Sequence, residues 1–176
     1  MTKHYKLIIF DLDGTLTPER TSSAAPFERR LLPGVKEKCR ELRREDVLLT
    51  LATNQSQMRL DHTIYHRLRD HISWLRKQID LFSWTSSADA RMKPHPAMLF
   101  EMMHIAYCGT RNTLMVGNST DDQEAAIAAG VDFEWAKDFF GWEMMGCGHD
   151  VSKVVCADEG TCHCSECEKE ARNEEK

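Results

Sequence analysis

The sequence has no long hydrophobic run. No apolar stretch approaches the length of about 20 residues that a membrane-spanning helix needs, which excludes an integral membrane protein of the helical type. The first residues also lack the pattern of a secretory signal peptide, because they lead directly into a short apolar stretch at residue 7. We therefore expect a cytoplasmic protein with no membrane partner.

An excess of positive charge is also lacking. The formal net charge is −5, which disfavours a protein dedicated to binding nucleic acid. No internal repeat is visible. A chain of 176 residues with 41% hydrophobic residues is long enough for one domain with a real core. We expect this domain over residues 1–142, followed by an acidic, cysteine-rich tail over residues 143–176.

The seven cysteines are unevenly distributed. Cys39 and Cys108 stand alone in helical patterns, and we expect both to be buried thiols. The other five lie in the last thirty residues, and in a chain without a secretion signal such a cluster favours metal binding over disulfides. The candidate ligands for a Zn²⁺ ion are Cys156, Cys162, Cys164 and Cys167. The alternative is a solvated, charged tail whose thiols have no role.

Short apolar runs alternate with helical periodicity along the chain. Strands are predicted over 7–10, 47–52, 81–84, 113–117 and 131–136, and polar loops over 15–30 and 85–91. Helices are predicted after Gly34, over 58–79, from the Pro96 region to Tyr107, and over 121–129. Strands that alternate with helices predict an α/β fold with a doubly wound parallel sheet.

Two carboxylates, Asp11 and Asp13, directly follow the first predicted strand, and Gly14 then permits a tight turn. In a parallel sheet, ligands bind outside the carboxyl ends of the strands. Two like charges held together there recruit a cation or raise a pKa, so that one acid can attack or bind metal while the other carries a proton. The alternative is a polar turn without chemistry.

Other polar residues follow the later strands. Thr53 and Asn54 end the second strand and can donate hydrogen bonds to a phosphoryl group, although Thr53 could instead cap the next helix. Lys93 precedes Pro94 and could neutralise a phosphate, whereas a lone lysine is more often a solvated surface charge.

The strand over 113–117 is followed by Asn118, Asp121 and Asp122. Oxygen ligands at this position would face the same edge of the sheet as Asp11 and could complete a Mg²⁺ site. Either acid could instead stabilise only the N-terminus of the following helix.

These four segments, taken in this order, resemble the four motifs of the haloacid dehalogenase (HAD) superfamily, and the resemblance covers about residues 5–140. It implies a Rossmann-like fold and a magnesium-dependent phosphatase. By resemblance, Asp11 would form an aspartyl-phosphate, and Asp13 would act as general acid and then as general base. Thr53, Asn54 and Lys93 would bind the phosphoryl group.

The resemblance also implies a metal site. Mg²⁺ would be held by Asp11, by the backbone carbonyl of Asp13, and by Asn118 or Asp122. The family usually has aspartate where this chain has Asn118, and an amide oxygen brings no charge, so the metal would be bound more weakly or Asp121 would substitute.

Only 41 residues separate Asp11 from Thr53, and 39 separate Thr53 from Lys93. Neither interval has room for a large cap domain, so we expect an open site shaped by the loop over 15–30. The motif variants are most similar to the capless subgroup, which includes histidinol-phosphate and heptose-bisphosphate phosphatases and polynucleotide 3′-phosphatases. The zinc loop of the sugar-phosphate members is absent, because residues 85–92 contain no Cys or His.

Three functions follow as hypotheses. The first is hydrolysis of a small phosphorylated metabolite, such as a sugar phosphate or nucleotide. The second is a 3′-phosphatase acting on nucleic-acid ends, favoured by basic residues on the predicted helix 58–79, which could equally form a solvated face. The third is a non-catalytic binding or regulatory module in which Asn118 marks a lost metal site. The basic residues on the predicted helix 58–79, on which the second hypothesis rests, are Arg59, His62, His66, Arg67, Arg69, His71, Arg76 and Lys77. No sequence feature indicates an oligomeric state.

Overall fold

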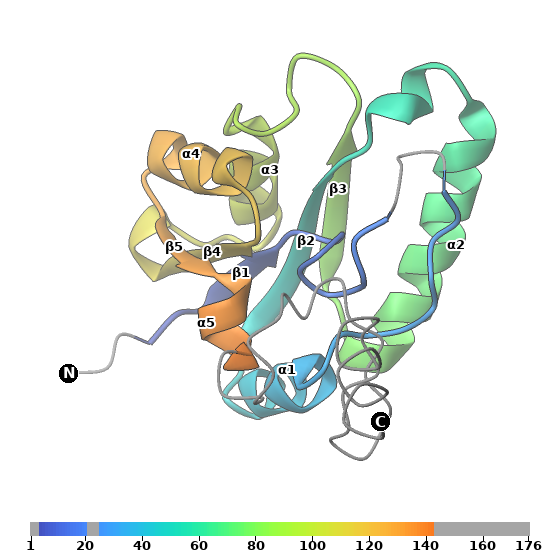
Figure 1. Cartoon of the computed structure of the whole chain (residues 1–176). Helices are drawn as coiled ribbons and strands as arrows, with labels where there is room; N and C mark the ends of the chain where they lie inside the picture. The colour runs from blue at the N-terminus through green and yellow to red at the C-terminus, as the bar shows by residue number, and fades with distance from the viewer. Residues whose placement is uncertain (1–3, 21–24, 143–176) are drawn as a thin grey trace, which may run out of the picture.

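The computed structural model describes residues 4–20 and 25–142, so the tail with the candidate zinc ligands Cys156, Cys162, Cys164 and Cys167 lies outside the described residues. The described residues form one parallel five-stranded sheet in the order β3-β2-β1-β4-β5 (Figure 1). This confirms the predicted α/β, doubly wound fold. The elements are β1 (Leu7–Phe10), α1 (Val35–Arg44), β2 (Leu48–Asn54), η1 (Ser56–Arg59), α2 (His62–Ile79), β3 (Ser83–Ser87), α3 (Ala97–Ile105), η2 (Thr110–Asn112), β4 (Thr113–Gly117), α4 (Thr120–Ala129), β5 (Asp132–Trp135) and α5 (Ala136–Phe140).

Strand β1 lies at the centre of the sheet because all four of its residues are apolar and can be buried on both faces. Ile9 pairs with Thr50 of β2 on one side and with Met115 of β4 on the other. All three strands run parallel, so their carboxyl ends meet at one edge of the sheet. The polar residues that follow β1, β2 and β4 are therefore brought to the same place.

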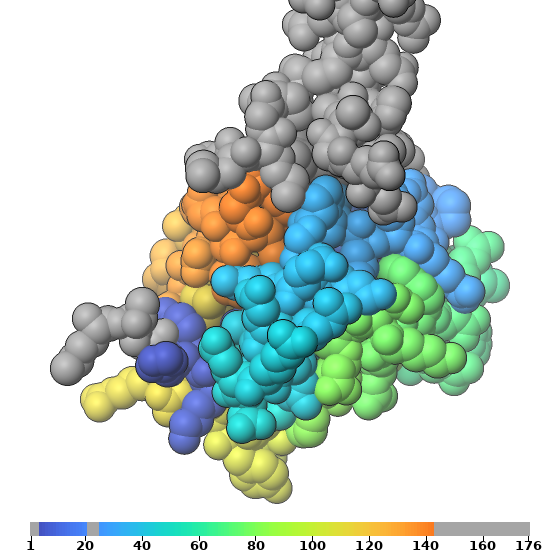
Figure 2. All heavy atoms as spheres, turned by 90° about the horizontal axis from the view of Figure 1, so that it is seen from below, coloured from blue at the N-terminus to red at the C-terminus, as the bar shows by residue number. Residues whose placement is uncertain are grey.

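Helices cover both faces of the sheet (Figure 1). On one face, Ile8 and Phe10 pack with α1, α2 and α5. On the other, Leu7 and Ile9 pack with α3 and α4. Figure 2 shows α1 and α5 side by side, and there the Trp142 indole donates to the Pro33 carbonyl at 2.8 Å. Among residues 4–20 and 25–142, no helix is long and apolar enough to span a membrane.

Two predicted elements differ most clearly from the structure. Helix α2 begins at His62 rather than at residue 58, because the Asp61 carboxylate caps it by accepting the Thr63 N–H at 2.8 Å. Residues 56–59 form the separate 3₁₀ turn η1. Strand β3 covers Ser83–Ser87, so it begins two residues later than predicted and extends into the first part of the predicted loop 85–91, because its backbone pairs with β2 up to Asn54 and Ser87. Backbone pairing on an edge strand does not require apolar side chains.

Two side chains also differ from expectation. His71 was counted among the basic residues of the helix, but it is 2% exposed, with its ring centroid 5.1 Å from that of Phe27 and 5.2 Å from that of Trp74. The basic surface is accordingly smaller. Cys39 is buried as predicted, whereas Cys108 is only half-buried because it lies in the turn after α3.

Candidate active site

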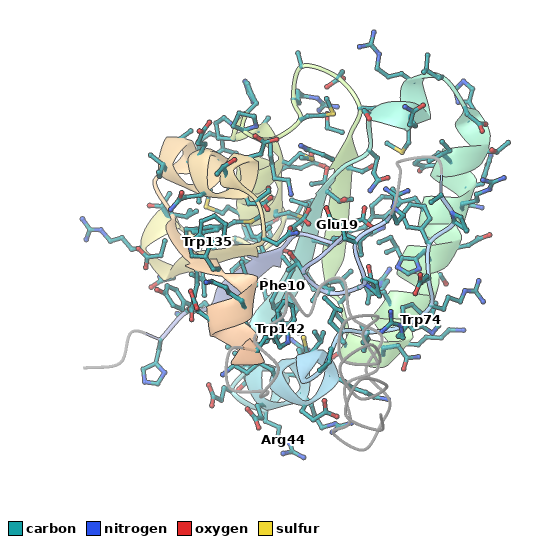
Figure 3. The ribbon with its side chains drawn as sticks, viewed as in Figure 1. Phe10, Glu19, Arg44, Trp74, Trp135 and Trp142 are labelled. Carbon is teal, nitrogen blue, oxygen red and sulfur yellow. The ribbon has the colours of Figure 1, made fainter. Side chains whose placement is uncertain are left out.

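A cleft of about 280 Å³ lies at the carboxyl ends of β1, β2 and β4. Every residue predicted to carry the phosphoryl chemistry lines this one cleft: Asp11, Asp13, Thr53, Asn54, Lys93, Asn118 and Asp122. Glu19, Arg20 and Ser119 line it as well, and sequence reasoning did not single them out. The loop after β1 that carries Glu19 approaches the sheet here (Figure 3).

Lys93 and Asp11 form a buried ion pair at the bottom of the cleft. The ammonium lies 2.6 Å from Asp11 Oδ1 and donates to the Ala52 carbonyl at 2.8 Å. Burial raises the pKa of Asp11 to about 7, and it outweighs the opposing attraction of Lys93. Among the described residues, the second oxygen of Asp11 receives no hydrogen bond.

Lys93 also pairs with Asp122, whose Oδ1 lies 2.6 Å from the ammonium. Burial by itself lowers the pKa of Lys93, but the two carboxylates together raise it above its ordinary value. The other oxygen of Asp122 accepts from the Ser119 hydroxyl at 2.7 Å and from the Ser119 N–H at 3.0 Å. Asp122 is thus held at the start of α4 by a capping box as well as by the lysine.

The backbone of Lys93 is fixed by Asn54. The Asn54 side chain accepts from the Lys93 N–H at 2.8 Å and donates to the Lys93 carbonyl at 2.9 Å. This pairing uses the oxygen and one N–H of the amide, and Asn54, which was predicted to bind the phosphoryl group, also lines the cleft. In this arrangement Asn54 connects the end of β2 to the lysine that reaches Asp11.

Asn118 lies against the turn that follows β1. Its Oδ1 accepts from the Thr15 hydroxyl at 3.3 Å. Gly14 has a φ of 78°, and a Cβ at this position would come within 2.2 Å of the Asn118 amide nitrogen. Only glycine satisfies both the backbone conformation and the close approach.

Asp13 is engaged by a network that includes two residues missed in the sequence. Arg20 donates to both carboxylate oxygens, from Nε to Oδ1 at 3.0 Å and from Nη2 to Oδ2 at 2.9 Å. Gln55 donates to Asp13 at 3.3 Å and to the Thr53 hydroxyl at 3.0 Å, and it accepts from Arg20 at 2.7 Å. Arg20 lies in a stretch without periodicity, so no sequence signal marked it. Gln55 directly follows Thr53 and Asn54, and that position was its only signal.

The cysteines predicted to bind zinc lie outside the described residues. Within residues 4–20 and 25–142, no group of three or more His, Cys, Asp or Glu side chains is arranged to hold a metal ion. Any metal in the cleft would therefore need backbone or amide oxygens in addition to carboxylates.

The amino-acid sequence is similar to those of known hydrolases. A protein-family model described as haloacid dehalogenase-like hydrolase matches residues 20–136. A phosphoglycolate phosphatase of Pseudomonas putida is 29% identical, with 72% of this chain and 67% of that protein covered. A D-glycero-β-D-manno-heptose-1,7-bisphosphate 7-phosphatase of Escherichia coli is 25% identical, with 74% of this chain and 78% of that protein covered.

Solved structures share the fold. A D,D-heptose 1,7-bisphosphate phosphatase from B. bronchiseptica, complexed with magnesium and phosphate, matches with a TM-score of 0.63 at 20% identity and covers 96% of this chain and 99% of its own. A HAD-superfamily hydrolase from Geobacter sulfurreducens matches with a TM-score of 0.52 at 21% identity, covering 73% of this chain and 88% of its own.

Proposed function

The chain belongs to the haloacid dehalogenase-like hydrolases, and from this premise we propose that it is a phosphatase that hydrolyses small phosphate monoesters through Asp11. The observation that carries the proposal is the buried Asp11–Lys93–Asp122 cluster, with both ion pairs at 2.6 Å. A lysine held between two carboxylates keeps its charge, and it fixes one oxygen of Asp11 while the other has no hydrogen-bond partner among the described residues. This suits a nucleophile that attacks an anionic phosphorus centre.

The reaction has two displacements. In the first, a carboxylate oxygen of Asp11 forms a bond to phosphorus, the ester P–O bond breaks, and Asp13 gives a proton to the leaving alcohol oxygen. In the second, Asp13 takes a proton from water, the water oxygen attacks phosphorus, and the bond to Asp11 breaks. Inorganic phosphate leaves, and both aspartates return to their starting states.

The residues around the cleft fit a magnesium ion. Asp11, the backbone carbonyl of Asp13 and the side-chain oxygen of Asn118 are the hard oxygen ligands that Mg²⁺ prefers. Asp122 fits this role less well, because Lys93 and Ser119 already engage its two oxygens. We therefore assign the third side-chain position to Asn118. When bound, Mg²⁺ would supply positive charge against the transferring phosphoryl group.

The substrate is proposed to be a small phosphorylated metabolite. The curated relatives that match are named for phosphoglycolate and for a heptose bisphosphate, both of which are small molecules. The second sequence hypothesis, a phosphatase for nucleic-acid ends, loses part of its basis because His71 is buried rather than on the basic surface of α2. The family match and the buried charge cluster favour an enzyme over a non-catalytic module.

The test is hydrolysis of a panel of sugar phosphates, nucleotides, phosphoglycolate and a 3′-phosphorylated oligonucleotide, with Mg²⁺ and with chelator. Wild-type turnover should stop with chelator, and Asp11→Asn should lower turnover by about 1,000-fold or more. Asp121→Asn is the matched control, because Asp121 is exposed and does not line the cleft. Equal turnover by Asp11→Asn and wild type would refute the mechanism, and turnover of the oligonucleotide alone would refute the substrate class.

A further inference from the structure

Arg20 lies against Asp13, the residue proposed to transfer the proton. Its guanidinium binds both oxygens of the Asp13 carboxylate, and its side chain is only 8% exposed. Both oxygens of Asp13 therefore already accept hydrogen bonds from the guanidinium. In the proposed mechanism Asp13 contacts the leaving oxygen of the substrate, so Arg20 has to give up part of this contact when a substrate binds.

The surroundings of Arg20 allow such a change. The guanidinium carbon lies 4.1 Å from the centroid of the Phe27 ring, and this ring stacks on buried His71. The stack holds the guanidinium at the edge of the cleft without using its in-plane N–H donors. The donors now bind Asp13, the Gln55 side chain and the Ala25 carbonyl, and those on Asp13 can turn to another anion while the aromatic contact is kept.

Arg20 is the basic residue of the cleft that is placed to contact a part of the substrate other than the reacting phosphate. Arg20 and Lys93 are the two basic residues among the described residues that line the cleft. Lys93 is buried and paired with Asp11 and Asp122, so it faces the reacting phosphate rather than the rest of the substrate.

We propose that Arg20 is a specificity-determining residue that turns from Asp13 to bind a second anionic group of the substrate, a carboxylate or a second phosphate. The inference rests on the proposed function and adds the substrate class: phosphate monoesters that carry a second acidic group. The relatives are named for substrates of this kind, because phosphoglycolate has a carboxylate and a heptose 1,7-bisphosphate has a second phosphate.

The experiment compares esters that differ only in the second anion. Phosphoglycolate is paired with ethyl phosphate, and 1,3-propanediol bisphosphate with propyl phosphate. A bidentate arginine contact predicts that wild type prefers the member with the second anion by about 10- to 100-fold in kcat/KM. The pair with the larger preference identifies whether the second group is a carboxylate or a phosphate.

Arg20→Ala should reduce this preference to about one, with Arg20→Lys in between because an ammonium cannot bind two oxygens in the same way. The loss should fall mainly on the esters with a second anion, because the esters with a single phosphate offer Arg20 no further group to bind. Arg44→Ala is the matched control, since Arg44 is an exposed arginine at the end of α1, far from the loop that carries Glu19 (Figure 3). It should keep the wild-type preference.

Two results would overturn the assignment: no preference in wild type, or an equal loss of both members of each pair in Arg20→Ala, which would make Arg20 a positioning residue for Asp13. If wild type hydrolyses none of the four esters, the wider substrate panel decides the proposed function. Calorimetric binding of phosphoglycolate and ethyl phosphate to wild type and Arg20→Ala then decides the Arg20 assignment alone: a wild-type preference that the variant loses supports it, and equal binding rejects it.

Discussion

Lys93 compensates the charge of two buried carboxylates, so its removal should affect both catalysis and stability. In Lys93→Met, Asp11 and Asp122 are left without a cation in a buried site. We expect the free energy of unfolding to fall by about 3–5 kcal/mol and turnover to fall by about 100-fold or more. Urea unfolding and phosphate release measure the two effects.

A second variant separates lost charge pairing from lost packing. Adding Asp122→Asn to Lys93→Met removes one of the uncompensated charges and should recover part of the lost stability, but none of the activity. Exposed Lys36→Met is the control and should change neither quantity. A double variant less stable than the single one would show that the buried charges are not the cause.

Asn118 contributes an amide where a carboxylate would add a charge. If it binds Mg²⁺ as proposed, Asn118→Asp should strengthen the metal site and lower the half-saturating Mg²⁺ concentration by about fivefold or more. Titration of turnover with Mg²⁺ measures this, with Asp121→Asn as a neutral comparison on the adjacent helix. An unchanged or higher Mg²⁺ requirement would remove Asn118 from the ligand set.

At the scale of elements, the contact between α2 and the loop that contains Phe27 makes stability depend on pH. Burial lowers the pKa of His71 from 6.5 to about 4. Between these values the unfolded chain binds a proton that the folded chain does not, so stability is complete above about pH 6.5 and declines as the pH falls towards 4. We expect this histidine to account for about 2 kcal/mol of that decline.

His71→Leu should remove this part of the decline, so its free energy of unfolding should change less between pH 7 and pH 4.5 than that of wild type. Denaturant unfolding at both pH values measures the difference. His66→Gln is the control on the same helix, because His66 is exposed and should leave the pH dependence as it is. An unchanged dependence in His71→Leu would mean that other groups cause it.

The elements also show what can be predicted from sequence. Apolar periodicity was sufficient for β1 and β4, because these strands are buried on both faces. It was insufficient for β3, where pairing with β2 decides the strand and the side chains are polar. Motif spacing identified seven of the residues that line the cleft. The place of Arg20 in the cleft and the burial of His71 could not be predicted. Both side chains pack against Phe27, which comes from a loop without periodicity.

At the scale of the whole molecule, the described residues include a five-stranded sheet and helices on both of its faces. Trp142, at their end, is buried and hydrogen bonded to Pro33. We therefore propose that residues 1–142 form the phosphatase domain, and that a chain ending at Trp142 unfolds cooperatively within a few degrees of the full-length midpoint and keeps its turnover.

The same truncation addresses the tail. If Cys156, Cys162, Cys164 and Cys167 bind zinc, the full-length protein should contain about one zinc per chain and the truncated protein none. Metal analysis of both proteins, together with Cys162→Ser and Cys164→Ser, measures this. Loss of cooperative unfolding or of turnover in the truncated chain would place the domain boundary further along the sequence.

The strand order has a consequence for how the protein is made. The central strand, β1, is made before the other four described strands, but its second neighbour, β4, begins 106 positions later, because Leu7 pairs with Thr113. While the ribosome adds the intervening residues, an all-apolar strand has one edge unpaired. During that interval the nascent chain is exposed to aggregation, and its dependence on chaperones should end only when β4 has emerged.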